Sequence, residues 1–518
     1  MDNLLPLGPV AWSFMGLYLC SLIAIGWVAK RAQQERSLKD FYLAGEGFGF
    51  LVLFLTLFAT QYSGNTFFAF TGATYRIGYS WVFSLHFMTA VVIGYLLFAP
   101  RLYVLAKKYH FLTPGDFISY RYRSPALTLL VTTVMIIVLC NFLLAQLMAM
   151  GRAMEGLAHD TDGSFYIHGV IVLALIMTIY GTLGGIRAVA WTYALQGAIL
   201  LVGFTVLAWL LVDRFGSLRA ATELLISRDL ENGTYMALSP TGARCREWLS
   251  YILAVGFGLC LYPQAIQRIY AARSAQVLRN SLRVMVFMPL PTILIALMAG
   301  IMALAYLPGL NGASADQIFG RVLREIQMHS IVGYALVIVT LAAVLAAMMS
   351  TADSALLSLS SMLTKDVVAK HFKPNSSQIY LTKVGKLFSW CVITVLVIFA
   401  ILLKDKASLI QIMDRKIDLL VQLFPAFVLG IRWQFLKAKP IMIGLLVGTC
   451  ISLVLPFATF EFVHNQKVFG FHPGLIGLVP NLLIALIGSL LKPEVRKNDS
   501  KQSVKMLTEA EARGQKLY

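Results

Sequence analysis

Residues 50–80 read FLVLFLTLFATQYSGNTFFAFTGATYRIGYS. Both ends of this stretch are apolar, as expected for a helix in hydrocarbon, where the backbone has to satisfy its own hydrogen bonds. The middle, TQYSGNT at 60–66, is polar and contains a glycine. Helix packing through small residues would explain part of such a run, but the run is longer than packing needs. It therefore predicts a broken membrane helix, whose freed carbonyls and amides can meet an ion and a solute.

The composition of the whole chain is that of a membrane protein. Its 518 residues are 58% hydrophobic and 13% charged, with a mean hydropathy of +0.75, whereas soluble domains are about a quarter charged. The net charge of +18 is spread between apolar segments, which favours membrane orientation over nucleic-acid binding as its cause. The six cysteines show no disulfide or metal-ligand spacing. Pumps and embedded enzymes are disfavoured, because the sequence has no Walker A, HExxH or GxSxG motif.

Apolar segments recur along the chain at membrane length, so we expect an all-α polytopic membrane protein with about 13 transmembrane helices. With the N-terminus outside, alternate loops place 29 lysines and arginines inside and 11 outside, in agreement with the positive-inside rule. We expect one transmembrane domain over 1–491 and a cytoplasmic tail over 492–518. The segments fall near 10–29, 50–74, 79–102, 125–157, 166–183, 189–213, 247–268, 280–307, 331–361, 380–404, 407–431, 440–458 and 473–491.

The stretch LAAVLAAMMSTADSALLSLSSMLTKDVV at 341–368 contains a second set of polar residues. On a helix, Ala347, Ser350 and Thr351 lie at i, i+3 and i+4 and therefore share one face. Two hydroxyls beside a small residue leave room for sodium, a hard cation that prefers oxygen ligands. If this helix is considered by itself, packing of its small residues against a neighbouring helix is the alternative explanation of the pattern. Asp353 favours a site, because an ionisable residue inside a membrane span is a functional candidate.

Glycines and a proline mark two further irregular points in the backbone. Gly184 and Gly185 predict a tight turn between the fifth and sixth segments. Gly256, Gly258 and Pro263 weaken the helix of the seventh segment. The seventh segment is therefore a second candidate for a broken membrane helix.

Five stretches carry a resemblance to a known family: DFYLAGEGFG at 40–49, ATQYSGNTF at 59–67, GTLGGIRAVAWTYALQ at 181–196, YPQAIQR at 262–268 and MSTADSALLSLSSMLTKDVV at 349–368. In these stretches the chain resembles the sodium:solute symporter family, which includes bacterial proline, pantothenate, sialic-acid and galactose symporters. The resemblance implies a LeuT-like fold of two inverted five-helix repeats, formed here by segments 2–6 and 7–11. Segments 2 and 7 would be the paired broken helices, and segments 1, 12 and 13 would be accessory.

The resemblance also implies where sodium and the solute bind. The sodium ligands would be the backbone carbonyls of Ala59, Tyr62 and Ala347 and the hydroxyls of Ser350 and Thr351. The solute would lie between the two broken helices, and gates would close the site on either side. By this resemblance the substrate-binding residues are Ser63, Gly64, Asn65, Phe257 and Pro263, and Arg268 lies near the inner gate. From the residues themselves we add Gln61 and Asp414 to the substrate-binding set and Asp353 to the gating set.

Two single residues depart from the family pattern. Gln61 stands where some members carry an acidic residue, which weakens the electrostatic attraction of sodium into the site. Tyr193 stands where an aspartate often follows Trp-Thr, which argues against an extra sodium site in that region.

The eleventh segment departs further, because SLIQIMDRKIDLLVQLFPAFVLG at 408–430 is charged where relatives are apolar or small. Asp414 and Asp418 lie at i and i+4, and Arg415 could pair with either. Buried charges need partners or a function. If these charges, which include Lys416, are functional, the segment would help to recognise a charged or zwitterionic solute or form part of the outer gate. The alternative is that the helix starts later and leaves the four charges outside the membrane.

We therefore expect a secondary active transporter in a bacterial plasma membrane that imports a small polar organic solute with sodium by alternating access. An amino acid or a carboxylate, such as proline or pantothenate, fits this expectation. No nucleic acid and no obligate protein partner is expected beside the solute, sodium and the lipid bilayer. Two alternatives remain open: a proton-coupled symporter in which Asp353 or Asp414 titrates, and a transporter-like solute sensor.

Overall fold

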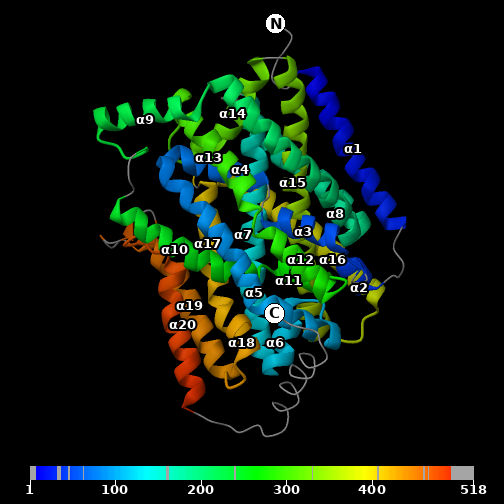
Figure 1. The fold of residues 1–518 in the computed structure, drawn as a ribbon. Coiled ribbons are helices and arrows are strands. Elements are labelled where there is room, and N and C mark those ends of the chain that lie inside the picture. Colours follow the sequence, from blue (N-terminus) through cyan, green and yellow to red (C-terminus); the bar gives the residue numbers. More distant parts are fainter. Residues whose placement is uncertain are drawn as a thin grey trace.

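The computed structural model describes residues 8–31, 37–44, 47–61, 64–158, 163–237, 241–329, 331–404, 406, 408–458, 461, 463–464 and 466–491. The expected tail over 492–518 lies outside this range. The described chain is almost entirely helical (Figure 1). The α-helices are α1 (Pro9–Arg31), α2 (Leu38–Leu43), α3 (Phe50–Gln61), α4 (Gly64–Ile77), α5 (Phe83–Tyr109), α6 (Pro114–Tyr122), α7 (Pro125–Ala158), α8 (Ser164–Phe215), α9 (Leu218–Asn232), α10 (Gly242–Gly258), α11 (Pro263–Ala271), α12 (Ala275–Met285), α13 (Pro289–Tyr306), α14 (Ile318–His329), α15 (Ile331–Met362), α16 (Gln378–Leu402), α17 (Leu409–Leu420), α18 (Gly430–Arg432), α19 (Ala438–Val454) and α20 (Pro473–Leu490).

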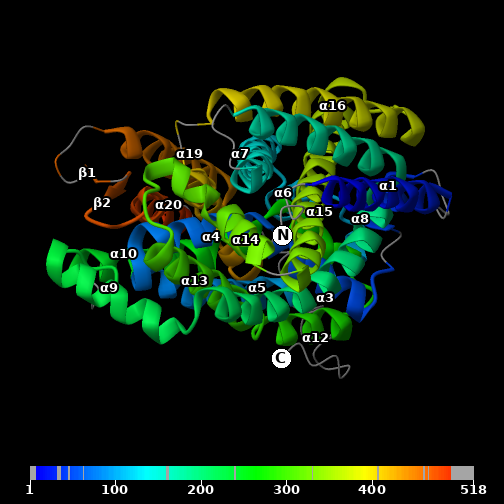
Figure 2. The same cartoon turned by 90° about the horizontal axis from the view of Figure 1, so that it is seen from above.

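Short helical turns and one small hairpin complete the fold. The turns are η2 (Gly78–Val82), η3 (Leu259–Leu261), η4 (Gly312–Gln317), η5 (Leu363–Phe372), η6 (Val421–Leu423), η7 (Pro425–Leu429) and η8 (Leu455–Phe457), and the hairpin pairs β1 (Val463–His464) with β2 (Lys467–Val468). The strands are antiparallel and connect α19 to α20. Figure 2 shows the hairpin at one edge of the bundle, beside α10, α19 and α20. These two short strands were not expected in an otherwise helical chain.

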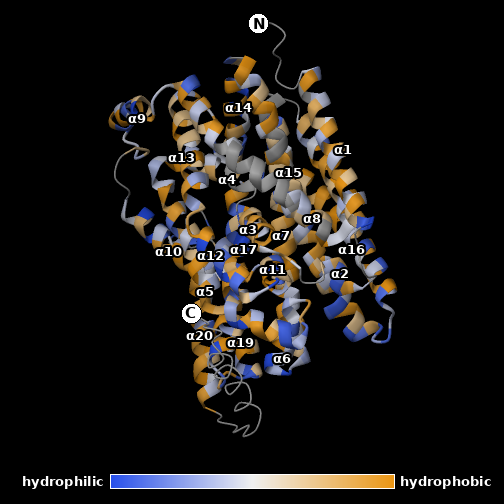
Figure 3. Cartoon of the chain, turned by 45° about the vertical axis from the view of Figure 1, so that its right-hand side comes forward, coloured by the Kyte–Doolittle hydropathy of each residue, from blue (hydrophilic) through white to orange (hydrophobic). Residues whose placement is uncertain are grey.

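Several helices of the bundle are long and apolar enough to cross a membrane. In the described part of the chain, eight helical stretches meet this standard by length and composition, or up to nine if the bent pair α10 and α11 is one span. Hydrophobic colour covers most of the long helices in Figure 3, and hydrophilic colour gathers near their ends, at α2, α6 and α9. The fold is therefore the expected polytopic bundle, and the count of 13 spans stays a prediction.

Of the two segments expected to be broken, the seventh is interrupted within the described residues. The axis bends by 53° where the helix over 242–261 meets α11. Tyr262 leaves helical geometry there, with φ −53° and ψ 130°, and Pro263 begins α11 without a backbone N–H to donate. The interpretation of Gly256, Gly258 and Pro263 as helix-weakening residues is therefore confirmed. In the second segment α3 ends at Gln61 and α4 begins at Gly64, and Tyr62 and Ser63 between them lie outside the described residues.

The turn expected at Gly184 and Gly185 is a kink inside one long helix. α8 runs through residues 183–189 without a loop, and Gly185 alone leaves helical geometry, with φ 60° and ψ −152°. A positive φ of this kind favours glycine, because it has no side chain to clash with the backbone. At Gly185 an added Cβ would also lie 2.7 Å from the carbonyl oxygen of Phe41. The boundary expected between the fifth and sixth segments therefore takes the form of this kink.

The start of α17 decides the position of the four charges in the eleventh segment. Ser408 caps this helix, because its side chain accepts from the N–H of Gln411 while the Gln411 side chain accepts from the N–H of Ser408. The helix therefore begins before the charges, and Asp414, Lys416 and Asp418 are all buried. The alternative that the helix starts after the charges is wrong, and their position relative to the membrane stays a prediction.

The helices that surround these breaks pack around one common interior. α15 lies against α7 and α8, α3 lies against α8 and α12, and α17 lies against α7 and α10. α1 packs on α8 from the outside, and α19 and α20 form a pair beside α17. In Figure 1, α9 and α14 lie at one end of the bundle, and α6 and α18 lie at the opposite end.

Candidate functional site

A small cavity lies at the meeting point of the broken helices with α5, α7 and α17. Its volume is about 30 Å³, room for only a water or two. The walls would have to move apart to admit a solute. The lining residues are Thr60, Gln61, Phe70, Phe87, Met88, Phe142, Gln146, Tyr251, Val255, Leu259, Tyr262, Ile410, Met413, Lys416 and Ile417.

Of the expected substrate-binding residues, Gln61 lies on the wall of this cavity. It is the last residue of α3, and its side-chain amide donates a 2.6 Å hydrogen bond to the hydroxyl of Tyr95 on α5. Phe257 instead packs against Phe424, with ring centroids 4.5 Å apart. Pro263 is buried at the start of α11, and neither Phe257 nor Pro263 is among the described lining residues.

Several other expected residues cannot be described in full. Tyr62 and Ser63 lie outside the described residues, and so do the side chains of Asn65, Ala347 and Ser350. Gly64 is the first residue of α4.

The end of α3 and the middle of α15 meet at two residues expected to bind sodium. The hydroxyl of Thr351 donates a 3.1 Å hydrogen bond to the carbonyl oxygen of Ala59. Both residues are fully buried. A carbonyl and a hydroxyl oxygen at this spacing are suitable ligands for one hard cation. The two residues are 292 positions apart in the sequence, and only the fold brings them together.

The two expected gating residues lie on helices that pack together, α11 and α15. The guanidinium of Arg268, on α11, donates to the carbonyl of Gln264 at 3.0 Å and to the hydroxyl of Ser354 at 2.6 Å. Asp353 is 1% exposed on α15. A Cβ added to Gly181 would lie 1.8 Å from its carboxylate, so α8 and α15 approach each other closely there. Arg268 therefore links the second broken helix to the helix that carries Thr351.

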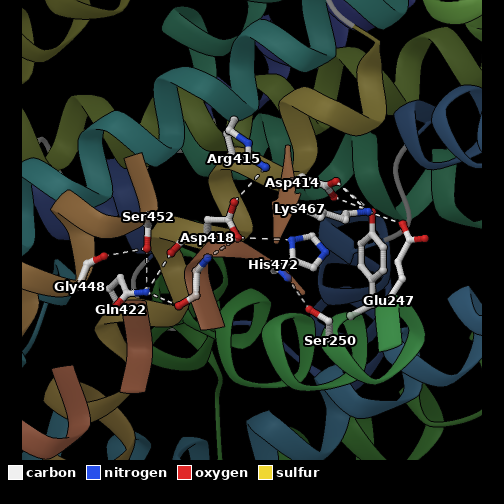
Figure 4. A network of polar contacts seen from close by, with 12 residues as sticks. Glu247, Ser250, Asp414, Arg415, Asp418, Gln422, Gly448, Ser452, Lys467 and His472 are labelled. Atoms are coloured by element: carbon white, nitrogen blue, oxygen red, sulfur yellow. Dashed lines mark hydrogen bonds and ion pairs between the residues drawn. The ribbon is translucent and has the colours of Figure 1, made fainter. Parts of the chain in front are cut away.

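On the hairpin side of the cavity, the hydroxyl of Tyr251 joins the wall to a buried charge cluster. It donates to the Asp414 carboxylate, 2.8 and 3.0 Å from its two oxygens. Lys467, from β2, pairs with Glu247 and lies 3.6 Å from Asp414 and 3.1 Å from the Tyr251 hydroxyl. Figure 4 shows Lys467 between Asp414 and Glu247. The hairpin is thus held to α10 and α17 by charges.

Asp418 anchors a second part of this network one turn along α17. Its carboxylate pairs with Arg415 at 3.2 Å, lies 3.3 Å from the ring of His472, and accepts from the backbone N–H of Gly474 at 2.9 Å. The next turn places Gln422 between α19 and α20, where its amide donates to the hydroxyl of Ser452 at 3.0 Å and to the carbonyl of Gly474 at 2.6 Å (Figure 4). α17 therefore connects the cavity to the two last helices.

A separate charged cluster lies at the end of the bundle that holds α6. Lys365, on η5, pairs with Asp116 at 2.6 Å, and Lys370 pairs with Asp366 at 3.0 Å. Thr113 donates to Asp366 at 3.0 Å. Burial acts to raise the pKa of the Asp116 carboxyl, but Lys365 and two backbone N–H groups together lower it below its usual range. Burial raises the pKa of Asp366.

The sequence pointed to only part of the site. Gln61, Asp414 and Lys416 were singled out within their segments. The contributions of Tyr251 and Lys467 were missed, because each acquires its contacts from segments far away in the sequence. The one available signal was the unmatched charge on the eleventh segment, which requires partners somewhere in the fold.

An apolar helix bent at Tyr262, beside a small cavity whose largely apolar wall carries a few polar side chains, is typical of a membrane transporter with its site at a broken helix. The model of the sodium:solute symporter family matches residues 41–448. The chain is 26% identical to the sodium/pantothenate symporter of Escherichia coli (strain K12), over 91% of this chain and 94% of the relative. It is 24% identical to the osmoregulated proline transporter OpuE of Bacillus subtilis (strain 168), over 95% and 96% of the two chains.

The three-dimensional comparison agrees with the sequence comparison. A solved structure of a Na⁺-coupled sialic acid symporter, in a substrate-bound outward-open state, superposes with a TM-score of 0.74 at 16% identity and covers 94% of this chain and 98% of that one. The fold is LeuT-like, as expected. The chain belongs to the sodium:solute symporter family, which supports sodium as its coupling ion.

Proposed function

We propose that this protein imports a small polar organic solute together with sodium, with the sodium at the contact between Ala59 and Thr351. The 3.1 Å hydrogen bond between these two residues carries the proposal. It joins the end of α3, in a segment expected to be broken, to α15, and such a contact would let an ion control the shape of the site. Bound sodium would take the carbonyl and the hydroxyl oxygen as ligands, with Tyr62, Ala347 and Ser350 completing the set.

The transport cycle follows from the position of this contact. Sodium from outside binds first and fixes the end of α3 against α15. Gln61, the last residue of α3, then presents its amide to the cavity, where the solute binds. Each sodium ion that moves inward gains about 2.3 kcal/mol per 100 mV of membrane potential, which is available to accumulate the solute. The names of the relatives, which refer to pantothenate and proline, suggest small organic acids and amino acids as the solutes to test first.

The polar clusters on the two sides of the cavity are proposed as gates. The contacts of Lys467 with Glu247 and Asp414 would close the outer side, and Arg268 and Asp353 would act on the inner side. This assignment puts the N-terminus and the hairpin outside and α6 inside, in the plasma membrane of a bacterium. It rests on the distribution of lysine and arginine between the loops.

The test is the thermal stability of the purified protein in sodium, with matched potassium and choline as references. A ligand that binds only the folded state stabilises it by about 2.7 kcal/mol at a hundred times its dissociation constant. We expect sodium to raise the melting temperature of the wild type. This rise should be absent in Thr351→Ala. Thr394→Ala is the matched control, because Thr394 is exposed on α16 and donates only to the carbonyl of Trp390. No sodium effect in the wild type would reject the proposed site.

Proton coupling is the second candidate, and Asp353 is the observation that favours it. In the described part of the structure, one oxygen of this buried carboxyl group has no hydrogen-bond partner. A carboxyl group in that position can take up and release a proton. Uptake driven by a proton gradient without sodium, and lost in Asp353→Asn, would favour this candidate over sodium coupling.

A further inference from the structure

Lys416 is a buried cation on the wall of the cavity. It lies on α17, is 1% exposed, and lines the cavity together with Phe142 and Tyr262. Its ammonium lies 4.4 Å from the centre of the Phe142 ring and 5.5 Å from that of Tyr262. Aromatic faces attract a cation, but they replace only part of the hydration that an ammonium loses on burial.

The neighbouring acidic groups are engaged elsewhere. Asp414 attracts Lys416 through space, but its carboxylate accepts from Tyr251 and faces Lys467. Asp418 is paired with Arg415. Among the described residues, no hydrogen bond or ion pair reaches the ammonium of Lys416. Lys416 is also the only charged side chain among the described residues that line the cavity.

We propose that Lys416 binds the carboxylate of the transported solute, an inference that rests on the proposed symport through this cavity. A carboxylate would give the ammonium the charge-assisted hydrogen bond that it lacks in this structure. The side chains around Lys416 define the rest of the solute. The side-chain amides of Gln61 and Gln146 suit hydroxyl or amide groups, and the Thr60 hydroxyl, which donates to the carbonyl of Thr56, can still accept a hydrogen bond.

The same wall selects against a free ammonium group on the solute. The described lining contains no carboxylate, so a zwitterionic amino acid would place its ammonium beside aromatic and aliphatic walls and near the like charge of Lys416. Leaving a charge unpaired in such a site is costly. The substrate class is therefore a small carboxylic acid that carries hydroxyl or amide groups and no amine.

The experiment measures binding to the full-length protein in saturating sodium, by thermal shift and by uptake into proteoliposomes. The carboxylate probes are pantothenate, lactate and pyruvate, the uncharged counterparts are pantothenyl alcohol and lactamide, and the zwitterions are proline and alanine. We expect at least one carboxylate to bind and to be taken up. We expect its uncharged counterpart and both zwitterions to bind at least about tenfold more weakly.

Variants of Lys416 then assign the effect to this side chain. Lys416→Gln should weaken carboxylate binding at least about tenfold, and Lys416→Arg, which keeps the charge, should restore part of it. Lys439→Gln is the matched control, because Lys439 is exposed on α19. Lys416→Gln should still be stabilised by sodium, which shows that it folds and that the proposed ion site is intact.

The outcomes separate this inference from the proposed function. Stabilisation by sodium together with binding of proline or alanine, or of no carboxylate in the panel, overturns the carboxylate assignment and leaves sodium coupling in place. Equal carboxylate affinity in the wild type and in Lys416→Gln also overturns it. Absence of the sodium effect in the wild type rejects the proposed sodium site, whatever the solutes do.

Discussion

The hydroxyl of Tyr251 lies 2.8 Å from one carboxylate oxygen of Asp414, and this hydrogen bond joins the cavity wall to the buried charges beside the hairpin. Tyr251 comes from the second broken helix, and Asp414 comes from α17. Lys467 completes the contact from β2, 3.1 Å from the same hydroxyl. Any movement that opens the cavity toward the hairpin therefore has to separate groups that are charged and buried together.

Tyr251→Phe tests this hydrogen bond with little change in shape. The variant leaves the buried Asp414 carboxylate without a donor, which we expect to lower the free energy of unfolding by about 1–3 kcal/mol. Denaturation of the purified protein in mild detergent measures the change. The control is Tyr235→Phe, because Tyr235 is 58% exposed and its hydroxyl can exchange protein contacts for water. Equal effects of the two substitutions would contradict a specific role for the bond to Asp414.

The ion pair of Lys467 with Glu247 should be worth more than a surface pair. Removing one partner of a buried pair leaves the other charge uncompensated and costs about 3–5 kcal/mol. We therefore expect Lys467→Met and Glu247→Gln each to destabilise the protein strongly. Arg244 remains as a partial partner of Glu247 in the first variant, and Asp414 remains as a partial partner of Lys467 in the second. The double variant should be less destabilised than the sum of the two, with a coupling of at least about 1 kcal/mol.

A second pair provides the comparison for this double-mutant cycle. Arg219 and Glu223 form a 2.8 Å ion pair on α9, with side chains 88% and 61% exposed. Exposed helix pairs of this spacing contribute about 0.3–0.5 kcal/mol. A coupling between Lys467 and Glu247 no larger than that of Arg219 and Glu223 would show that the hairpin is not held by this pair.

The features that could be predicted from the sequence are those that depend on residues close together within one segment. Gly256, Gly258 and Pro263 lie close together and weaken one helix, so the break between α10 and α11 was predictable from local chemistry. Gly185 marks a point where the backbone leaves the helix. Membrane helices must satisfy their own hydrogen bonds, so residues that prevent this stand out in an apolar sequence.

The partners of the site residues could not be predicted in this way. Glu247 and Lys467 are 220 positions apart, and Asp414 and Tyr251 are 163 apart. Each pair depends on how whole helices pack, and local hydropathy does not encode that. The position of Lys416 on the cavity wall likewise depends on the rotation of α17 about its axis. The charges showed that partners were needed, and only the fold shows which ones.

Gly474 occupies a place where no side chain fits. An added Cβ would lie 2.4 Å from the Cα of Asp418 and 2.9 Å from its carbonyl oxygen, which are backbone atoms that cannot turn aside. The N–H of Gly474 also donates to the Asp418 carboxylate. Gly474→Ala should therefore push α20 away from α17 and cost about 1–3 kcal/mol. Gly16→Ala, which meets nothing within 4 Å, should be neutral or stabilising. Equal melting temperatures for the two variants would contradict this close packing.

The cluster of Asp116 and Lys365 should make stability depend on pH. The folded protein holds the pKa of Asp116 below the unfolded value, which is about 3.9. A carboxyl group with a lowered folded pKa stabilises the protein above its unfolded pKa, and it loses this contribution as the pH falls through the folded pKa. Lys365→Met removes the nearby positive charge and leaves the burial, so Asp116 no longer stabilises the fold at neutral pH.

The difference in melting temperature between the wild type and Lys365→Met should therefore be largest at neutral pH and should shrink as the pH falls below about 4. Asp366, whose pKa is raised by burial, is present in both proteins, so its direct contribution largely cancels from the difference. Lys383→Met, at an exposed lysine on α16, should show a small difference from the wild type at every pH. A difference for Lys365→Met that stays constant between pH 7 and acid would mean that Lys365 acts through packing alone, because only an interaction with an ionised Asp116 disappears on protonation.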